Sequence, residues 1–383
     1  MQLGGAQRAR MVTQAPWGVL LASLAVSGIG LYNLMSAARS MWTSQAVYLL
    51  VGIGVLIAVT FVDLRFIQSA TVPVYLLNIA LLLALKVVGH KAKGAESWLV
   101  LGPFRVQPAE FMKIGMILMM AKYFHDDYRP ASPSYGFLRL IPPLVLAVVP
   151  TLLVLVQPDL GTALMMTFTA LTLVAFARVK WTVVVAAGIV GLAGAGVIWN
   201  DFARPVPEGE KRVTLVRHHL KKHQEGRISG WLEPESDLKG TNYHSMQSKI
   251  AVGSGGISGK GWKEGTQTAL RYLPEQHTDF IFSVWAEEHG FMSCLLLLFL
   301  YGVILVGALN VAYNARDRFG AFVAVGIAAM IFWQVFENIG MVTGLLPVTG
   351  ITLPLMSYGG SSMVSVMLGI GLLANISMRR HLF

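Results

Sequence analysis

The sequence predicts an all-α polytopic membrane protein with about ten transmembrane helices and one large extracytoplasmic loop between the seventh and eighth helices. Of the 383 residues, 55% are hydrophobic and only 13% are charged. A typical soluble domain has about 25% charged residues. Apolar runs of about 20 residues, the length needed to cross a bilayer, recur along the chain. This composition excludes an ordinary soluble enzyme, and it also excludes a disordered chain, which would be polar and rich in charge.

Ten apolar runs are candidate transmembrane helices. They are residues 17–38, 47–62, 72–88, 111–124, 140–156, 161–177, 183–199, 280–313, 319–346 and 363–376. The fourth run is short, so we expect its helix to begin earlier, near Pro108. The eighth and ninth runs are long and are expected to tilt or to extend beyond the bilayer. The first run is longer than the core of a signal peptide, about 7–15 residues, which indicates a membrane anchor.

The lysines and arginines of the short loops predict the orientation of the chain. With the N-terminus inside, twelve of these residues fall on the inner side and five on the outer side. The inner set is Arg8, Arg10, Arg65, Lys122, Arg129, Arg139, Arg178, Lys180, Arg316, Arg318, Arg379 and Arg380. The outer set is Arg39, Lys86, Lys91, Lys93 and Arg105. Both termini are therefore expected in the cytoplasm. The net charge of +10 fits loops that face anionic lipid.

We expect one membrane domain in three parts. Residues 1–199 form a cytoplasmic tail and helices one to seven, residues 200–279 the extracytoplasmic loop, and residues 280–383 helices eight to ten with a cytoplasmic C-terminus. The basic first half of the loop favours an amphipathic helix on the lipid surface. The single cysteine, Cys294, lies in an apolar run and is expected in the core.

A glycine-rich stretch of the loop, residues 253–261, invites comparison with a phosphate-binding loop. It departs from the Walker pattern, because Ser254 stands at the first glycine position and Gly261 follows Lys260 in place of serine or threonine. Two interpretations stay open: a backbone that binds a diphosphate through its amide groups, and a flexible turn.

His277, Thr278 and Asp279 stand at the start of the eighth apolar run. One interpretation is that Asp279 caps the helix that follows. The other is that it presents a carboxylate at the outer membrane boundary, where it accepts a proton from a substrate hydroxyl.

Charged residues inside apolar runs are costly, so they usually pair with each other or line a polar cavity. Glu110 and Lys113 are three residues apart on one predicted helix, which predicts an ion pair. Asp159 follows Gln-Pro at a break between two runs and is expected to cap the next helix or to line a cavity. Three further acidic residues are candidates for an ion pair or a proton relay: Glu287, Glu288 and Glu337.

The segment from residue 344 to residue 362 is polar and proline-containing, although it lies between two apolar runs. Irregular backbone at that depth is tolerated only against protein or a water-filled cavity. We therefore expect a re-entrant or rim segment that faces the same outer cavity as Asp279. The nine histidines show no His-Glu-x-x-His pattern, and there is no cysteine cluster that predicts zinc. The residues alone leave an enzyme and a transporter open.

Five motifs together resemble the SEDS family (shape, elongation, division and sporulation), and the resemblance covers nearly the whole chain. They are Gln107-Pro-Ala-Glu-Phe-Met-Lys113, Gln157-Pro-Asp-Leu-Gly-Thr-Ala163, Gln247-Ser-Lys-Ile-Ala-Val-Gly-Ser-Gly-Gly256, Leu273-Pro-Glu-Gln-His-Thr-Asp-Phe-Ile-Phe282 and Leu353-Pro-Leu-Met-Ser-Tyr-Gly-Gly-Ser-Ser362. The short N-terminus and Gly265-Thr-Gln-Thr268 are more similar to the RodA branch of the family than to its division branch.

The resemblance implies a peptidoglycan glycosyltransferase of the bacterial cytoplasmic (inner) membrane, with its active site on the extracytoplasmic side. Such enzymes polymerise lipid II into β-1,4-linked glycan strands during cell elongation and cell-shape maintenance, and they release undecaprenyl pyrophosphate. The implied protein partner is a class B penicillin-binding protein, a transpeptidase. Contact with membrane lipid is also expected, and binding of nucleic acid is not. A lipid II flippase is the alternative function, and a scaffold that recruits a transpeptidase is a third.

By resemblance, the essential aspartate of the family falls on Asp279. The substrate-binding candidates are Trp98, Arg105, Glu110, Lys113, Asp159, Lys249, Lys260 and His277. Ser97 stands where the family usually has a basic residue, so a phosphate-binding role is in doubt at that position. The departing diphosphate needs fixed positive charge or a metal, which makes a divalent cation, Mg or Mn, a candidate cofactor.

Overall fold

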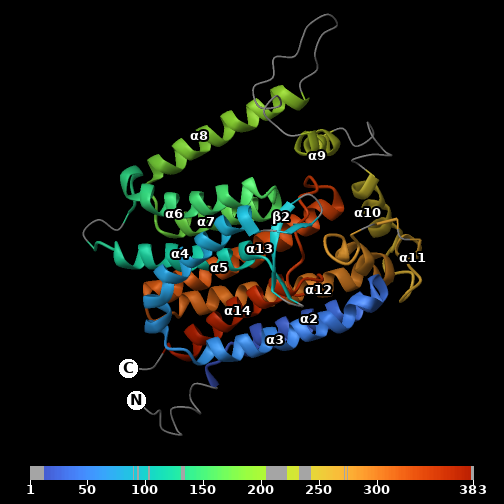
Figure 1. The fold of residues 1–383 in the computed structure, drawn as a ribbon, viewed down its shortest axis with the longest axis horizontal. Helices are drawn as coiled ribbons and strands as arrows, with labels where there is room; N and C mark the ends of the chain where they lie inside the picture. The colour runs from blue at the N-terminus through green and yellow to red at the C-terminus, as the bar shows by residue number, and fades with distance from the viewer. Residues whose placement is uncertain are drawn as a thin grey trace, which may run out of the picture.

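The computed structural model describes residues 13–88, 90–92, 95–101, 104–130, 134–203, 222–232, 243–270, 272–273 and 275–380. The chain is predominantly helical (Figure 1). The helices are α2 (Trp17–Ala37), α3 (Trp42–Phe61), α4 (Leu64–Val88), α5 (Pro108–Asp126), α6 (Phe137–Val156), α7 (Leu160–Phe176), α8 (Trp181–Ile198), α9 (Lys222–Leu232), α10 (Tyr243–Ser254), α11 (Thr266–Ala269), α12 (Ile281–Tyr313), α13 (Arg318–Thr343) and α14 (Gly360–Met378), with short helical turns η1 (Arg39–Met41) and η2 (Trp199–Ala203).

Each of the ten apolar runs overlaps a helix, namely α2 to α8 and α12 to α14. By length and composition, eight of these helices are able to cross a membrane. The other two are α7, which has 17 residues, and α5, which begins at Pro108 as expected. The protein is therefore a multi-pass membrane protein.

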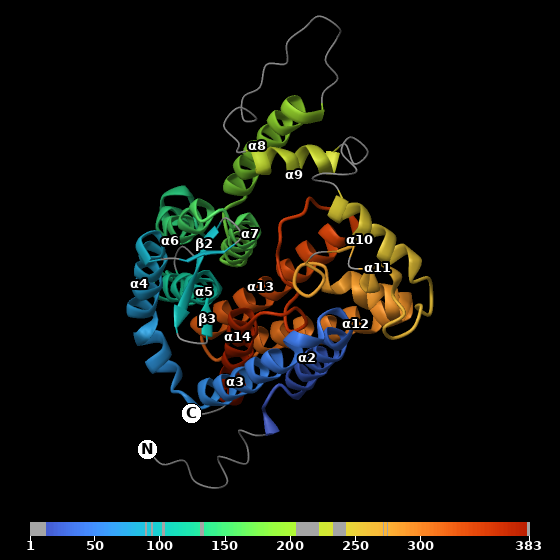
Figure 2. The same ribbon diagram turned by 45° about the vertical axis from the view of Figure 1, so that its right-hand side comes forward.

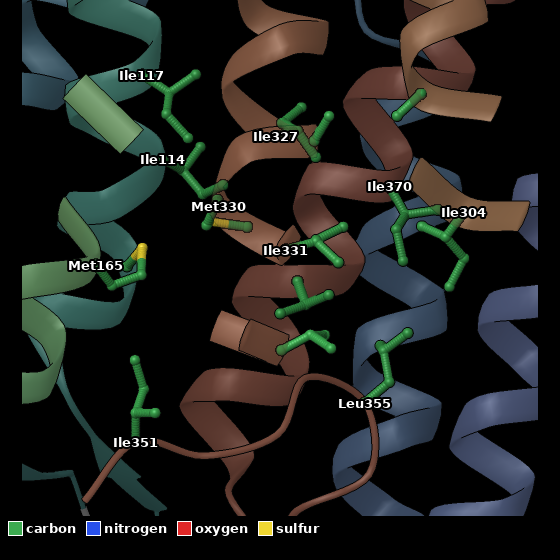
Figure 3. Close-up of a cluster of buried hydrophobic side chains, with 14 of the residues drawn as sticks. Ile114, Ile117, Met165, Ile304, Ile327, Met330, Ile331, Ile351, Leu355 and Ile370 are labelled. Carbon is green, nitrogen blue, oxygen red and sulfur yellow. The ribbon is translucent and has the colours of Figure 1, made fainter. Parts of the chain in front are cut away.

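The centre of the bundle is formed by α13 and α14. Within the most apolar 18 residues of each helix, 78% of the residues are buried in α13 and 89% in α14. In α8 none of the corresponding residues is buried. Small residues let the helices approach closely, as in other membrane bundles: a Cβ at Gly326 of α13 would collide with Ile117 of α5. Figure 3 shows Ile114 and Ile117 of α5 beside Ile327 and Met330 of α13.

The long helix α12 has 33 residues but is not continuous, because Gly290 has a φ of 73° and a ψ of −174°. The expected long, tilted span is thus a helix with a break. The loop after α10 packs against the break and pairs with its backbone. The bonds run from Lys260 N to Glu287 O (3.0 Å), from Gly261 N to Glu288 O (3.0 Å), from Phe291 N to Gly256 O (2.9 Å) and from Met292 N to Ile257 O (3.2 Å). The loop therefore satisfies backbone groups that the break would otherwise leave unpaired.

A small antiparallel sheet connects α4 to α5, and the all-α prediction missed it. Its strands are β1 (His90–Ala92), β2 (Ala95–Leu101) and β3 (Phe104–Val106), in the order β1-β2-β3. Trp98 lies opposite His90, and Val100 lies opposite Arg105. Strands this short give too little alternation to be recognised between two long apolar runs.

The region predicted as one loop, residues 200–279, contains α9, α10 and α11. Most of its basic first half lies outside the described residues, including Lys211, Arg212 and Arg217 of the expected amphipathic helix. α10 packs against α12 and α13. Figures 1 and 2 show α8 standing apart from the bundle, with α9 near its end.

The segment from residue 344 to residue 359, called the 344–359 segment below, connects α13 to α14 without regular structure. It is packed inside the bundle: Ile351, Leu353 and Met356 are buried. A Cβ at Gly30 of α2 would stand 2.7 Å from the Cα of Met356, so this position needs glycine. The irregular backbone is packed against protein, as expected at this depth.

Candidate functional site

Residues 275–280 form a turn directly before α12. Glu275 O accepts hydrogen bonds from the amides of Thr278 (3.2 Å) and Phe280 (3.2 Å). The N-cap of α12 is Phe280, and its first helical residue is Ile281. Asp279 therefore precedes the cap position, and the interpretation of Asp279 as the cap residue is wrong.

Three successive carbonyls of this turn accept hydrogen bonds from other elements. The pairs are Tyr358 N to His277 O (2.9 Å), Ser357 Oγ to Thr278 O (2.7 Å) and Asn338 Nδ2 to Asp279 O (2.8 Å). Asn338 Nδ2 also donates to Ile351 O at 2.7 Å. One amide of α13 thus ties the turn to the 344–359 segment. These bonds fix the backbone of Asp279 without using its carboxylate.

The side chain of Asp279 is only partly buried, and it faces Gly350. A Cβ added to Gly350 would stand 3.4 Å from Asp279 Oδ2, and Gly350 has a φ of 79°, where side chains are disfavoured. The 344–359 segment therefore lies beside the Asp279 carboxylate. That the two face one outer cavity stays a prediction.

A cavity of about 630 Å³ lies beside this turn, between the end of α2 and the region around α11. Its lining includes His277 from the turn and two cations, Arg39 and Lys263, and it includes no carboxylate among the described residues. Arg39 and Lys263 are both exposed residues. A site of this charge favours an anionic ligand. Neither cation was among the substrate-binding candidates predicted from the sequence, although Arg39 was counted in an outer loop.

Arg105 lies on the same side of the molecule as the turn. Ser361 Oγ donates to Arg105 O at 3.3 Å and accepts from Gln107 N at 3.0 Å. The charge of Arg105 acts on Tyr358, whose ring lies 6.0 Å from that of His277. Burial raises the pKa of the Tyr358 hydroxyl, and Arg105 opposes the rise.

Trp98 is partly buried in β2. Its partner across the sheet is His90, and the side chain of Ser97 lies outside the described residues.

Glu110 and Lys113 form the predicted ion pair. Lys113 Nζ lies 2.7 Å from Glu110 Oε2, and the two side chains are 1% and 7% exposed. Ser365 Oγ of α14 donates to the same carboxylate oxygen at 2.9 Å. Removing one partner of a buried ion pair destabilises a protein by about 3–5 kcal/mol, because the other charge is left buried without compensation. Loss of either Glu110 or Lys113 is therefore expected to weaken the fold, in addition to any effect on ligand binding.

Asp159 caps α7, which confirms one of its two expected roles: its Oδ1 accepts from Thr162 N at 3.0 Å. Gln107 Nε2 donates to the other oxygen at 3.0 Å. Burial raises the pKa of the Asp159 carboxyl, and the hydrogen bonds from Thr162 oppose the rise. Lys113 and Asp159 act electrostatically on Glu337, whose two carboxyl oxygens are buried with no hydrogen-bond partner in the described parts of the chain.

Lys260 pairs with Glu287, a buried residue of α12, at 2.7 Å. The other oxygen of Glu287 accepts from Thr268 Oγ1 at 3.1 Å. Because the amides of Lys260 and Gly261 already donate to α12, the phosphate-loop interpretation is wrong for these two groups. Gly255 and Gly259 serve close packing instead, since a Cβ at either position would collide with a carbonyl oxygen of α12, that of Ala286 or of Glu288.

Lys249 is exposed on α10 and lies against Gly344, the C-cap residue of α13. It therefore stands at the end of α13 that also carries the 344–359 segment.

Cys294 is buried, as predicted.

A metal bound by the protein alone needs several converging ligands. Among the described residues, no three His, Cys, Asp or Glu side chains are grouped in this way. No site for a resident Mg or Mn ion is therefore assigned to the described side chains, and no chemical step is assigned to such an ion.

Comparison with known proteins connects this site to a family. The FtsW/RodA/SpoVE family model, described as a cell cycle protein, matches residues 11–382. The peptidoglycan glycosyltransferase MrdB of Escherichia coli K12 is 36% identical over 364 residues, which cover 95% of this chain and 93% of that protein.

Two solved structures share the fold. One is described as a peptidoglycan synthase complex that coordinates polymerization and crosslinking; its matching chain has a TM-score of 0.77 and 32% identity, with 95% of this chain and 98% of that chain covered. The other is the rod shape determining protein RodA of Thermus thermophilus, with a TM-score of 0.68 and 29% identity, covering 95% and 97% of the two chains.

Proposed function

Because the chain belongs to the FtsW/RodA/SpoVE family, it is a peptidoglycan glycosyltransferase, and we propose that Asp279 is the catalytic base of its reaction. The observation that carries this proposal is the anchoring of the turn before α12. Its carbonyls at His277, Thr278 and Asp279 are held by donors from α13 and the 344–359 segment. A backbone fixed in this way presents a partly exposed carboxylate in one position, as general base catalysis requires.

The proposed substrate is lipid II, and the reaction is a direct displacement. The 4-hydroxyl of the acceptor GlcNAc attacks C1 of the donor MurNAc, and its proton passes to the carboxylate of Asp279. The bond between C1 and the diphosphate oxygen breaks, and undecaprenyl pyrophosphate leaves with the electron pair. Displacement of an α-linked diphosphate gives a β-1,4 bond with inversion, so one carboxylate suffices.

The leaving diphosphate gains negative charge, which fixed cations stabilise. We propose that Arg39 and Lys263, in the cavity beside His277, supply this charge. Lys260 and Lys113 are less suited, because each is already paired with a buried carboxylate. Arg105 and Lys249 remain candidates for the second lipid II molecule. A divalent cation is proposed to arrive with the diphosphate rather than on a protein site.

The test of the base is Asp279→Asn in purified protein, with lipid II as substrate and glycan polymer measured on a gel. We expect a loss of about 100- to 10,000-fold in rate, the usual contribution of a general base. Glu264→Gln, which removes an exposed carboxylate from the loop before α11, is the control and should keep its activity. Polymer at the wild-type rate from the Asp279 variant would reject the assignment.

The proposed diphosphate site is tested by Arg39→Gln and Lys263→Gln. Each should lower kcat/KM for lipid II by about 10-fold or more, equivalent to about 1.4 kcal/mol of transition-state stabilisation. Arg65→Gln, which removes an exposed arginine from the first turn of α4, is the matched control. Unchanged kcat/KM in both cavity variants would remove these residues from the site.

The names of the relatives favour an enzyme over a flippase. Polymer formation in detergent separates the two functions, because it does not need two compartments. We further propose a class B penicillin-binding protein as partner, supported by the likeness to a complex that combines polymerization and crosslinking. A role in cell elongation and an active site on the extracytoplasmic side are also proposed; the charge bias of the loops supports this orientation.

A further inference from the structure

A second cavity, of about 320 Å³, lies at the other end of α13. Its lining residues are Tyr128, Phe176, Ala177, Arg178, Arg318, Ala321 and Phe322. They come from the end of α5, the end of α7 and the start of α13. Arg318 and Asn338 stand on the same helix, roughly 30 Å apart along its axis. The second cavity is therefore remote from the turn that holds Asp279.

We propose that this cavity binds the phosphate headgroup of an anionic phospholipid. Two of its lining residues are arginines, and its lining contains no carboxylate among the described residues. The volume is at the lower end of the range of about 300–1,000 Å³ for ligand pockets, which suits a headgroup but not a whole lipid. Basic pockets between transmembrane helices on the cytoplasmic side are typical sites for such headgroups.

Arg318 is held in place and has an unused donor. Its guanidinium carbon lies 4.0 Å from the centre of the Tyr128 ring and 5.6 Å from that of Phe322. The Nε atom is buried and finds no acceptor in the part of the chain that the structure describes. A buried donor of this kind is costly unless it is satisfied. A phosphate oxygen is a matching acceptor, because guanidinium groups bind phosphates through paired N–H donors.

Arg178 is fixed in position by its backbone. It has a φ of 60°, and its carbonyl accepts from Tyr135 N at 3.1 Å. The nearby acidic groups are engaged elsewhere: Asp127 binds Arg139 at 2.7 Å, and Asp317 caps α13 by accepting from Gly320 N at 2.7 Å. Neither aspartate lines the cavity, whose described lining contains two arginines and no carboxylate.

The other side of the cavity is aromatic and lies beside exposed apolar residues of α7. Phe176 is 44% exposed, and its ring packs edge-on against Phe322 with centroids 5.0 Å apart. Leu171, earlier on α7, is 50% exposed. An apolar wall beside two arginines matches the junction of a phospholipid headgroup with its acyl chains. This combination favours a lipid phosphate over free inorganic phosphate.

The experiment measures lipid retention by the full chain in detergent with native mass spectrometry. Phosphatidylglycerol, phosphatidylcholine and inorganic phosphate are added separately. We expect phosphatidylglycerol to be retained about 10-fold more tightly than phosphatidylcholine, or about 1.4 kcal/mol. Equal retention of the two lipids, or binding of inorganic phosphate as tight as that of phosphatidylglycerol, would overturn the proposal.

Two kinds of variant separate binding from folding. Arg178→Gln with Arg318→Gln removes the charge, whereas Ala321→Phe fills the cavity and leaves both arginines in place. Both should lose the preference for phosphatidylglycerol, and Arg65→Gln should keep it. Retention of the preference by Ala321→Phe would contradict the proposed site even if the double arginine variant failed to fold.

Discussion

At the residue scale, the contacts of Asn338 explain how a membrane helix controls the position of Asp279. Its side-chain amide donates to Asp279 O and to Ile351 O. Both acceptors are backbone carbonyls, so the amide orients the turn and the 344–359 segment together. Asn338 acts through Asp279 and is a positioning residue for the proposed base.

Replacing Asn338 with Ala should therefore slow polymer formation more than it weakens the fold. A displacement of the base by about 1 Å costs about 100-fold in rate. We expect kcat to fall by about 10- to 100-fold with KM nearly unchanged. Kinetics with lipid II, together with thermal unfolding, give the two readouts. Asn314→Ala, which removes an exposed amide at the end of α12, is the control. A normal kcat for the Asn338 variant would exclude the positioning role.

At the element scale, the break in α12 and the glycine-rich loop form one structural unit. The loop supplies amides to Glu287 O and Glu288 O, and the helix after the break returns amides to the loop. Lys260 and Glu287 add an ion pair across the same contact. The glycine-rich loop thus stabilises the break in α12 by forming hydrogen bonds with the backbone on both sides of Gly290.

Gly259→Ala is expected to weaken this contact. Gly259 has a φ of 82°, and a Cβ there would meet the backbone of Glu288. The left-handed conformation costs about 1–2 kcal/mol in a residue with a side chain, and overpacking adds about 1–3 kcal/mol. Thermal unfolding in detergent measures the loss. Gly253→Ala has open space around its Cβ and should be neutral or slightly stabilising. Equal stability of the two variants would refute the packing role of Gly259.

The sequence predicted the apolar helices well, because long hydrophobic runs have few alternatives in a membrane. It missed the sheet around Trp98 and Arg105, since strands of three to seven residues leave a weak pattern. The break at Gly290 also escaped notice, although Glu287, Glu288 and His289 directly precede it in the apolar run. A single glycine in such a run predicts no particular backbone angle.

Part of the candidate site was also predictable, because local patterns in the sequence pointed to it. Resemblance pointed to Asp279, and spacing along one helix predicted the ion pair of Glu110 and Lys113. The hydrogen bonds from Asn338 to Asp279 O and Ile351 O, and the cavity lined by Arg39 and Lys263, bring together residues far apart in the sequence. Such contacts depend on how the helices pack, which a local pattern does not encode.

At the scale of the whole molecule, the two cavities lie near opposite ends of the bundle. The proposed catalytic turn and the cavity with Lys263 lie towards one end, and the cavity with Arg318 lies towards the other. The loop charges predict the first end outside the cell and the second in the cytoplasm.

This orientation is testable because the chain has a single cysteine, the buried Cys294. In a Cys294→Ser background, Lys263→Cys should react with a membrane-impermeant maleimide added to intact cells. Arg65→Cys, also exposed on the protein surface, should react only after the membrane is opened. Labelling in the reverse order would invert the proposed topology.

The continuity of α13 from Arg318 to Thr343 has a mechanical consequence. One end of this helix borders the cavity with the two arginines, and Asn338, near the other end, grips the backbone of Asp279. A rigid rod cannot shift at one end alone, so a tilt imposed by a thinner or thicker bilayer changes the alignment of both. If Asp279 is the base, we expect the rate of glycan synthesis to depend on membrane thickness.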